Sequence, residues 1–383
     1  MPQSPRSVLL ALTGLDIDGG IASVSRCVAT ALDECIDAGT LERVDRVLLL
    51  SDSGAPPGPK LGVQRLARGS QARFLFEAVG RVLAAPPDLV FFDHVGLART
   101  ASLPWSPVRR SPYAVFVHGG ELDAAGRGHR RRALAGAARV LANSPFTAER
   151  VRRDFPEVAE RVHIVQLCID PDRWRRWERG LAAHGGSEPR RPAALIVGRM
   201  AAEERGKGHD SLIAAWPAIR SRVPASELWI VGGGDDRPRL ERLAEQLGVA
   251  DAVHFWGRVS DDELQRLYLK AAVFAMPSRQ EGFGLVYAEA MLHGLPCVGS
   301  DADAAGTVIR DGETGVLVPF GDVPALESAI AGLFLDPARA LRLGAAGTRR
   351  ARERYTYPRF RAALLEALGI DRDSRGNGEA SPG

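Results

Sequence analysis

The sequence predicts an α/β protein made of two doubly wound units that face a central cleft. Short, almost continuously apolar runs alternate with helical stretches, a pattern typical of parallel strands buried on both faces. The alternation stops over residues 178–192, which contain Gly185-Gly-Ser187 and two prolines, and then restarts. At 383 residues the chain also exceeds what one hydrophobic core usually supports. In such folds ligands bind beside the carboxyl ends of the strands.

Residues 1–182 are expected to form the first unit. A turn at Asp18-Gly-Gly20 separates its first strand from a helix over 21–36. Ser144 precedes a proline, and this pair is typical of an N-cap followed by the first helical residue, so a helix is expected to follow. The buried strands of this unit are expected at 8–13, 47–50, 89–92, 114–117 and 139–142.

Residues 183–192 are expected to form a linker, and residues 193–355 the second unit. Ser260-Asp-Asp-Glu263 is a capping box that predicts the start of one of its helices. A final helix is expected within 356–370, and a disordered polar tail over 371–383. The strands of the second unit are expected at 194–197, 228–231, 253–256, 273–276 and 296–299, and its helices near 209–222, 237–247, 261–271, 284–293, 322–335 and 338–355.

The composition argues against several classes of protein. A hydrophobic content of 45% and a charged content of 25% are ordinary for a soluble globular protein. The net charge of +3 is too small to indicate nucleic-acid binding. No segment reaches the roughly 18 apolar residues of a membrane span, and the N-terminus does not resemble a signal peptide. The four scattered cysteines favour reduced thiols, so we expect a cytoplasmic enzyme whose contact with a membrane, if any, is peripheral.

The most informative stretch is Glu281-Gly-Phe-Gly-Leu-Val-Tyr-Ala-Glu289. Its two carboxylates stand eight positions apart, the first on the loop before a predicted helix and the second inside that helix. Gly282 and Gly284 remove side chains from the start of the helix, so backbone N–H groups can approach an anion there. A site in which backbone amides bind phosphate and carboxylates bind hydroxyls suits a nucleotide sugar. The alternative is a helix whose acids face solvent.

Two cations precede this stretch at positions suited to a diphosphate. Arg199 follows the first strand of the second unit, and Lys207 opens the next helix. A guanidinium fork and an ammonium at a strand end would stabilise the charge of a departing diphosphate, whereas either residue alone is typical of a solvated surface. Gly233 lies in a triple-glycine strand end, which is a weak signal. Arg258 and Val259 end another strand, where they are placed to contact a base or phosphates.

In the first unit, His118 follows a predicted strand and precedes two glycines, which leaves it open to a ligand. A purely structural histidine is the alternative. Gly19 and Gly20 lie after the first strand, where glycine lets the backbone approach a donor closely.

With these motifs in order, the chain resembles the family-4 glycosyltransferases, which have the GT-B fold of two Rossmann-like domains. The resemblance spans essentially the whole chain and is strongest over 198–318. It implies that Arg199 and Lys207 bind the donor diphosphate, that Glu281 holds sugar hydroxyls, and that Glu289 binds ribose. Enzymes of this family retain the anomeric configuration.

The resemblance assigns further roles. It implies that Phe283, Gly284 and Leu285 form a loop that meets sugar and phosphate, with Val286 nearby. It implies that His118 faces the transferred sugar and that Gly19 and Gly20 lie over the donor. It also implies a GDP- or UDP-linked co-substrate, no metal, no other cofactor, and a last helix that returns to the first domain.

Two positions depart from the family pattern. Residues 301–307 replace a stretch that commonly carries a glycine pair and a glutamate, which puts local sugar or loop contacts in doubt. Gly206 stands where relatives often have an aromatic residue, which could loosen the loop.

We therefore expect a retaining hexosyltransferase that uses a nucleotide-sugar donor and a sugar, lipid-linked or small-molecule acceptor. Bacterial polysaccharide or glycolipid assembly is the expected setting, and a soluble natural-product acceptor is the alternative. A nucleotide-sugar epimerase and an inactive sugar-nucleotide-binding subunit are the other classes. The basic run 127–132 is either a solvated helix face or a contact with an anionic membrane or a lipid diphosphate.

Overall fold

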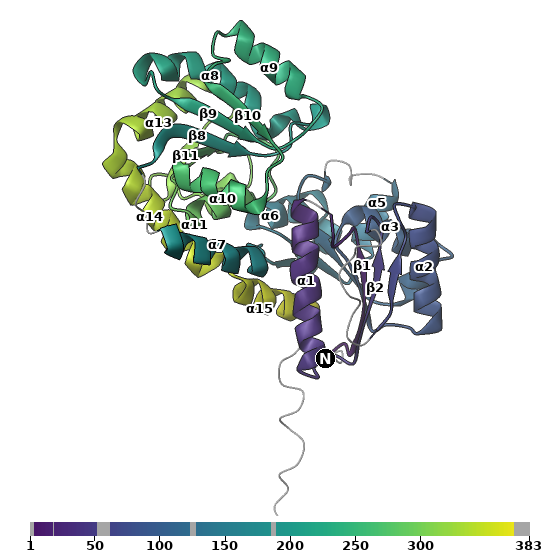
Figure 1. The fold of residues 1–383 in the computed structure, drawn as a ribbon. Coiled ribbons are helices and arrows are strands. Elements are labelled where there is room, and N and C mark those ends of the chain that lie inside the picture. The colour runs from purple at the N-terminus through teal and green to yellow at the C-terminus, as the bar shows by residue number, and fades with distance from the viewer. Residues whose placement is uncertain (1–3, 18, 52–61, 123–127, 185–188, 371–383) are drawn as a thin grey trace, which may run out of the picture. The chain divides into compact units, whose positions relative to one another are not determined.

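The computed structural model describes residues 4–17, 19–51, 62–122, 128–184 and 189–370. The predicted disordered tail, 371–383, lies outside the described residues. The chain divides into two compact units (Figure 1). Unit 1 comprises residues 1–170 and 357–383, and unit 2 comprises residues 171–356.

Unit 1 is built on a seven-stranded parallel sheet with the strand order β3-β2-β1-β4-β5-β6-β7. Every residue of β4 and β5 is buried, as expected for strands with helices on both faces. The strands are β1 (Ser7–Leu12), β2 (Arg43–Leu48), β3 (Gln64–Leu66), β4 (Leu89–Phe92), β5 (Tyr113–Val117), β6 (Arg139–Ala142) and β7 (Val162–Ile164). The helices are α1 (Gly20–Asp37), α2 (Gln71–Ala84), α3 (Val95–Ser102), α5 (Gly128–Ala135), α6 (Pro145–Asp154) and α15 (Tyr357–Leu368).

The last helix, α15, belongs to unit 1 and packs against α1, β6 and β7 (Figure 1). Arg361 on α15 pairs with Glu34 on α1 at 2.6 Å. Arg139 on β6 donates to the carbonyl of Ala367 at 2.9 Å. Unit 1 is therefore assembled from two separate stretches of chain.

Unit 2 is built on a six-stranded parallel sheet with the order β10-β9-β8-β11-β12-β13. Both halves are thus doubly wound α/β units, which confirms the predicted α/β class and its two units. The strands are β8 (Arg191–Val197), β9 (Glu227–Val231), β10 (Val253–Gly257), β11 (Ala271–Met276), β12 (Cys297–Ser300) and β13 (Gly315–Val318). The helices are α7 (Pro171–His184), α8 (His209–Arg222), α9 (Arg237–Gln246), α10 (Asp261–Lys270), α11 (Leu285–Leu292), α12 (Ala305–Val308), α13 (Val323–Leu335) and α14 (Pro337–Arg354).

The expected linker is the main difference from the sequence prediction. Residues 178–184 are the second half of α7, β8 begins at Arg191, and the units divide after residue 170. The helix is mostly polar, but Trp177 is fully buried, with its ring against Tyr268 and His293. One large apolar anchor holds a segment whose low apolar count indicated a linker.

In the described parts of the chain, no helix is both long enough and apolar enough to cross a lipid bilayer.

Candidate functional site

Three loops at the carboxyl ends of β8, β9 and β10 lie in close contact in unit 2. Gly232 has a φ of 135°, and a Cβ there would lie 2.1 Å from the carbonyl oxygen of Gly198. The N–H of Met200 donates to the carbonyl of Gly233 at 2.9 Å. Arg258 packs over Gly233, with its Nε 3.4 Å from the place of a Cβ. Glycine is needed here because the triple-glycine loop touches the Arg199 loop and leaves no room for a Cβ. These glycines therefore do more than turn the chain.

The two predicted cations converge on a single carboxylate, that of Glu204. Arg199 pairs with one oxygen of Glu204, and the Nζ of Lys207 lies 4.0 Å from the other. The side chain of Lys207 runs beside Gly198, 3.2 Å from the place of a Cβ. Arg199 is 69% exposed and Lys207 is 25% exposed, so solvent reaches both charges. The structure brings the predicted pair together around an anionic group that sequence reasoning missed.

The Lys207 segment lies against the loop that carries Glu281. The N–H of Arg279 donates to the carbonyl of Gly206 at 2.9 Å. A Cβ at Gly206 would lie 2.9 Å from the side-chain oxygen of Gln280, so this chain has no room for an aromatic side chain there without rearrangement. Gly208, with a φ of 93°, packs on Pro277. Gly206 is buried, with the side chains of Arg279 and Gln280 beside it, and the loosening of the loop stays a prediction.

Asp303 holds the Glu281 loop in place. Its buried carboxylate accepts hydrogen bonds from the N–H of Glu281 at 2.9 Å, the hydroxyl of Ser278 at 2.5 Å and the N–H of Ala305 at 2.9 Å. Burial raises the pKa of Asp303 to about 6, against these hydrogen bonds. Glu281 itself is half-buried. Asp303 belongs to residues 301–307, the stretch that departs from the family pattern. Only its tertiary contacts reveal that it holds the Glu281 loop.

The glycine-flanked start of α11 is also as expected. Gly284 is the N-cap in the left-handed region, with a φ of 84°, and no side chain caps the helix. Leu285 and Val286 form a half-buried first turn. Phe283 is 2% exposed and packs on the ring of Tyr355. Glu281 lies on the preceding loop and Glu289 lies inside the helix, which confirms the predicted position of each acid, whereas their contacts with a nucleotide sugar stay a prediction.

Glu289 has a different environment from Glu281. It is 5% exposed, and its two oxygens accept from Arg173 at 2.9 Å and from the hydroxyl of Tyr268 at 3.1 Å. Arg173 also pairs with Asp261 at 2.7 Å. Burial raises the pKa of Glu289, and the positive charge of Arg173 acts in the opposite direction. Glu289 therefore joins α7, α10 and α11 in a partly buried ionic network, and ribose binding stays a prediction.

In unit 1, His118 lies at the carboxyl edge of the sheet, where β5 ends. Its Nε2 is 2.8 Å from the carbonyl oxygen of Asp93, and its ring stacks on Phe116. The carboxylate of Asp93 is buried and accepts from Ser25 at 2.7 Å and from the N–H of Thr13 at 2.6 Å. Burial raises the pKa of Asp93 to about 6. The sequence indicated His118 but not Asp93, which directly follows β4 without a recognisable motif.

Gly19 and Gly20 lie at the start of α1, and both are exposed. A Cβ on either would meet no described atom within 4 Å. Val259 is half-buried and Arg258 is exposed beside it. Of the predicted basic run, Arg127 lies outside the described residues, and Arg131 on α5 pairs with Glu157 at 2.8 Å.

No group of three or more His, Cys, Asp or Glu side chains that could hold a metal ion occurs in the described part of the chain.

Comparison with known proteins identifies the family. Residues 39–173 match the family described as Glycosyltransferase Family 4, and residues 191–336 match Glycosyl transferases group 1. Over 192 residues the chain is 38% identical to the GDP-mannose-dependent alpha-(1-6)-phosphatidylinositol monomannoside mannosyltransferase of Mycolicibacterium smegmatis, covering 48% of this chain and 50% of that protein. Over 245 residues it is 31% identical to the D-inositol 3-phosphate glycosyltransferase of Rhodococcus opacus, covering 62% and 54%. The chain spans about half the length of these curated relatives.

Solved structures share the fold. Sucrose-phosphate synthase from Thermosynechococcus elongatus superposes with a TM-score of 0.76 at 22% identity, covering 94% of this chain and 97% of that chain. Anabaena Alr3699/HepE in complex with UDP-glucose superposes with a TM-score of 0.74 at 19% identity, covering 95% and 99%. Identities at this level show the fold alone. Taken with the family matches, they show that the chain belongs to the family-4 glycosyltransferases of the GT-B fold.

Proposed function

We propose that this protein transfers a sugar from a nucleotide-diphosphate sugar to an acceptor hydroxyl, with retention of the anomeric configuration. The observation that carries the proposal is the convergence of Arg199 and Lys207 on one carboxylate, that of Glu204. A protein carboxylate at this point occupies the place suited to an anionic ligand. The glycine loop at 232–234 borders the Arg199 loop, and the side chain of Arg258 packs over Gly233.

The chemistry needs positive charge where the leaving group forms. As the bond between the sugar carbon and the phosphate oxygen breaks, negative charge grows on the diphosphate, and fixed cations lower the energy of that state. Arg199 supplies a planar fork and Lys207 a point charge. Both are solvent-accessible, so the diphosphate would displace Glu204 and take over its two partners.

Retention is compatible with attack on the same face of the sugar. In that mechanism the acceptor oxygen bonds to the sugar carbon as the phosphate departs, and the acceptor's proton passes to a phosphate oxygen. Glu281 would hold the hydroxyls of the transferred sugar on the loop that Asp303 fixes. In unit 1 we assign the acceptor to the carboxyl edge of the sheet, where Asp93 and His118 lie.

The donor and the setting follow the relatives. The mannosyltransferase relative is named for GDP-mannose, and Alr3699/HepE was solved with UDP-glucose. We therefore propose a GDP- or UDP-linked donor with no metal requirement, and an acceptor in glycolipid or polysaccharide assembly. Incubating each donor without acceptor tests the epimerase alternative, because an epimerase would form an isomeric nucleotide sugar.

Isothermal titration calorimetry with UDP and with GDP tests the clamp. Because a hydrogen bond to a charged group contributes about 1.5–3 kcal/mol, Arg199→Ala and Lys207→Ala should each weaken binding of the better nucleotide by about 10-fold or more. Arg205→Ala is the matched control, since Arg205 lies between Arg199 and Lys207 in the sequence but pairs with Asp236 at 3.1 Å. Unchanged affinity in both clamp variants, or an equal loss in the control, would contradict the proposal.

A further inference from the structure

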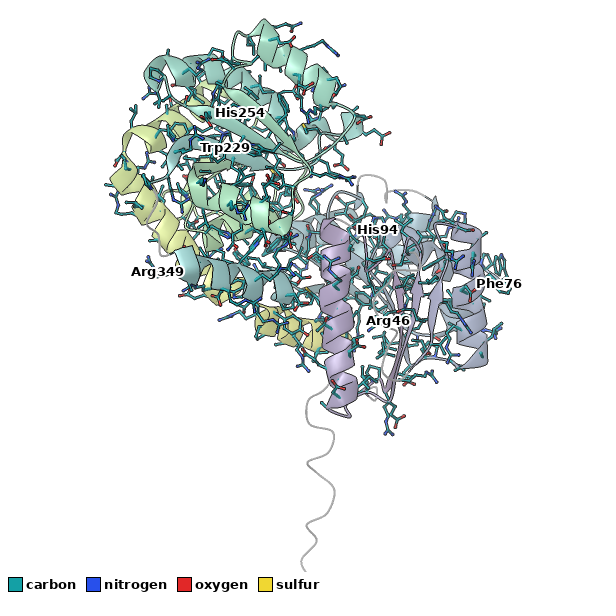
Figure 2. The ribbon with its side chains drawn as sticks, in the orientation of Figure 1. Arg46, Phe76, His94, Trp229, His254 and Arg349 are labelled. Atoms are coloured by element: carbon teal, nitrogen blue, oxygen red, sulfur yellow. The ribbon has the colours of Figure 1, made fainter. Side chains whose placement is uncertain are left out.

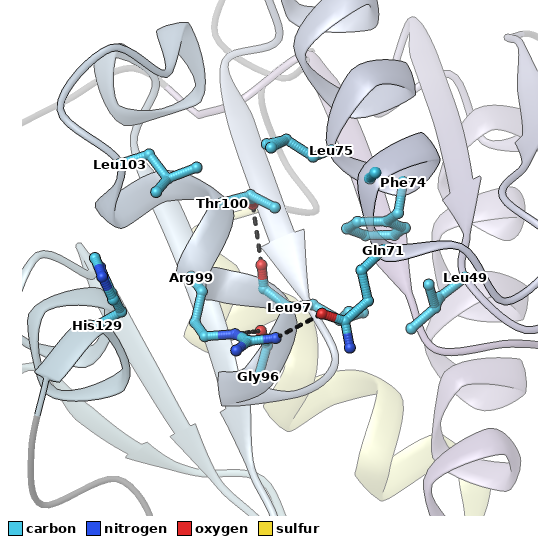
Figure 3. Close-up of a pocket in the computed structure, with 11 residues that line it drawn as sticks. Leu49, Gln71, Phe74, Leu75, Gly96, Leu97, Arg99, Thr100, Leu103 and His129 are labelled. Carbon is cyan, nitrogen blue, oxygen red and sulfur yellow. Dashed lines mark hydrogen bonds between the residues drawn. The ribbon is translucent and has the colours of Figure 1, made fainter.

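A mostly apolar cavity of about 280 Å³ opens in unit 1 between α2 and α3 (Figure 3). Apolar side chains outnumber polar ones in its wall. Its polar members are Gln71, Arg99, Thr100 and His129. The apolar side chains that line it are Leu49, Ala72, Phe74, Leu75, Leu97 and Leu103.

The cavity lies at the functional edge of the sheet. Leu49 directly follows β2, Gln71 is the first residue of α2, and Gly96 is the second residue of α3. These positions are at the carboxyl ends of the strands, the edge at which doubly wound sheets bind ligands. The N–H of Gly96 donates to the Nδ1 of His94 at 2.9 Å, and His94 follows Asp93 in the chain. The carbonyl of Asp93, which is 2.8 Å from the Nε2 of His118, thus lies three positions before the lining residue Gly96.

The polar side of the cavity is prepared for an anion. The Nε of Arg99 donates to the carbonyl of Gly96 at 2.8 Å, and its Nη2 donates to the side chain of Gln71 at 3.2 Å (Figure 3). These bonds hold the guanidinium across the two helices while using only part of its five N–H donors. Among the described residues that line the cavity, none is an Asp or a Glu. An arginine held in this way matches a phosphate or carboxylate group.

Two exposed apolar side chains stand close in the sequence to residues that line the cavity. Phe76 follows the lining residue Leu75 on α2 and is 74% exposed (Figure 2). Trp105 stands two positions after the lining residue Leu103 and is 66% exposed. A group the size of a water molecule takes up about 30 Å³, so the cavity of about 280 Å³ accepts about nine heavy atoms.

We infer that this cavity binds the hydrocarbon chain of an anionic amphiphile, the acceptor of the proposed transfer, with Arg99 contacting its head group. Only the assignment of this amphiphile as the acceptor rests on the proposed function. The apolar wall supplies binding energy from the area removed from water, and Arg99 selects the charged end. The position at the carboxyl edge directs the head group toward the polar group around His118.

Calorimetry with dodecyl phosphate below its critical micelle concentration tests the inference on the full chain. Ala72→Trp and Leu103→Trp should each fill the cavity, and Arg99→Gln should remove the charge; each should raise the Kd about 10-fold or more. Leu341→Trp, at a 66% exposed site in unit 2, and Arg109→Gln, at an exposed arginine that bonds to the carbonyl of Pro104, are the controls and should change nothing. Ethyl phosphate and dodecyl maltoside should bind at least 10-fold more weakly than dodecyl phosphate.

Three results would overturn the inference: no binding of dodecyl phosphate, equal binding in both cavity-filling variants, or equal affinity for ethyl phosphate or dodecyl maltoside. The last result would mean that either the chain or the charge is not recognised. UDP and GDP titrations of the same variants separate this inference from the proposed function. Loss of dodecyl phosphate binding with normal nucleotide binding identifies the cavity, whereas absent nucleotide binding in the wild type counts against the transferase proposal.

Discussion

Replacing Glu289 with alanine tests whether this carboxylate is a structural part of unit 2. The substitution removes the acceptor of Arg173 and of the Tyr268 hydroxyl in a buried place. Breaking a buried ion pair costs about 3–5 kcal/mol. Arg173 is 29% exposed and keeps its pairing with Asp261 at 2.7 Å, so we expect a smaller loss, about 2–3 kcal/mol. For a unit of this size each kcal/mol lowers Tm by about 2–4 °C, which gives a decrease of about 4–12 °C.

Thermal unfolding followed by circular dichroism measures this decrease. Glu241→Ala is the matched control, because Glu241 also pairs with an arginine at 2.7 Å but is 40% exposed. Exposed pairs contribute little, so the control should lower Tm by less than about 2 °C. Equal Tm values for the two variants would refute the structural role. A Glu289→Ala protein with wild-type Tm and lost affinity for UDP and GDP would instead favour ribose binding.

Three further substitutions separate the functions of neighbouring residues. Glu204→Gln should tighten UDP or GDP binding about 2–5-fold by calorimetry, since exposed pairs are worth up to about 1 kcal/mol; weaker binding would mean that Glu204 positions the cations. Burial raises the pKa of Asp303 from 3.8 to about 6, so the folded state binds this proton more tightly than the unfolded state, and stability falls as pH rises from about 4 to about 6. Asp303→Asn should therefore reduce the slope of Tm against pH in this range, and an unchanged slope would contradict the prediction. Gly232→Ala should weaken nucleotide binding about 10-fold or more, whereas Gly248→Ala, with a φ of 68° but no described atom within 4 Å of its Cβ, should not; equal effects would argue against loop contact.

Strands buried on both faces could be predicted closely from the sequence. The predictions at 89–92 and 139–142 coincide with β4 and β6, because continuous apolar runs in this range are typical of central parallel strands. Strands β3, β7 and β13 were missed. Strands β3 and β7 have three residues each and β13 has four, and all three lie at an edge of a sheet, where less burial leaves a weaker hydrophobic pattern.

The site was predictable at the level of loops and less so at the level of partners. Glycine spacing and strand ends indicated Arg199, Lys207 and the start of α11. The contact between Asp303 and the Glu281 loop spans 22 residues, and the pairing of Arg173 with Glu289 spans 116 residues. Such pairings depend on how the sheet and helices pack, and no local pattern encodes them.

The discontinuous make-up of unit 1 has a consequence for how the protein is synthesised. Domains generally fold as units while the ribosome is still translating. Unit 2 is encoded by one stretch, 171–356, so all of its residues are available before α15 has been made. Unit 1 starts first but lacks the partner of Glu34 on α1 until Arg361 emerges. The half of the protein that is translated first is therefore the half that is completed last.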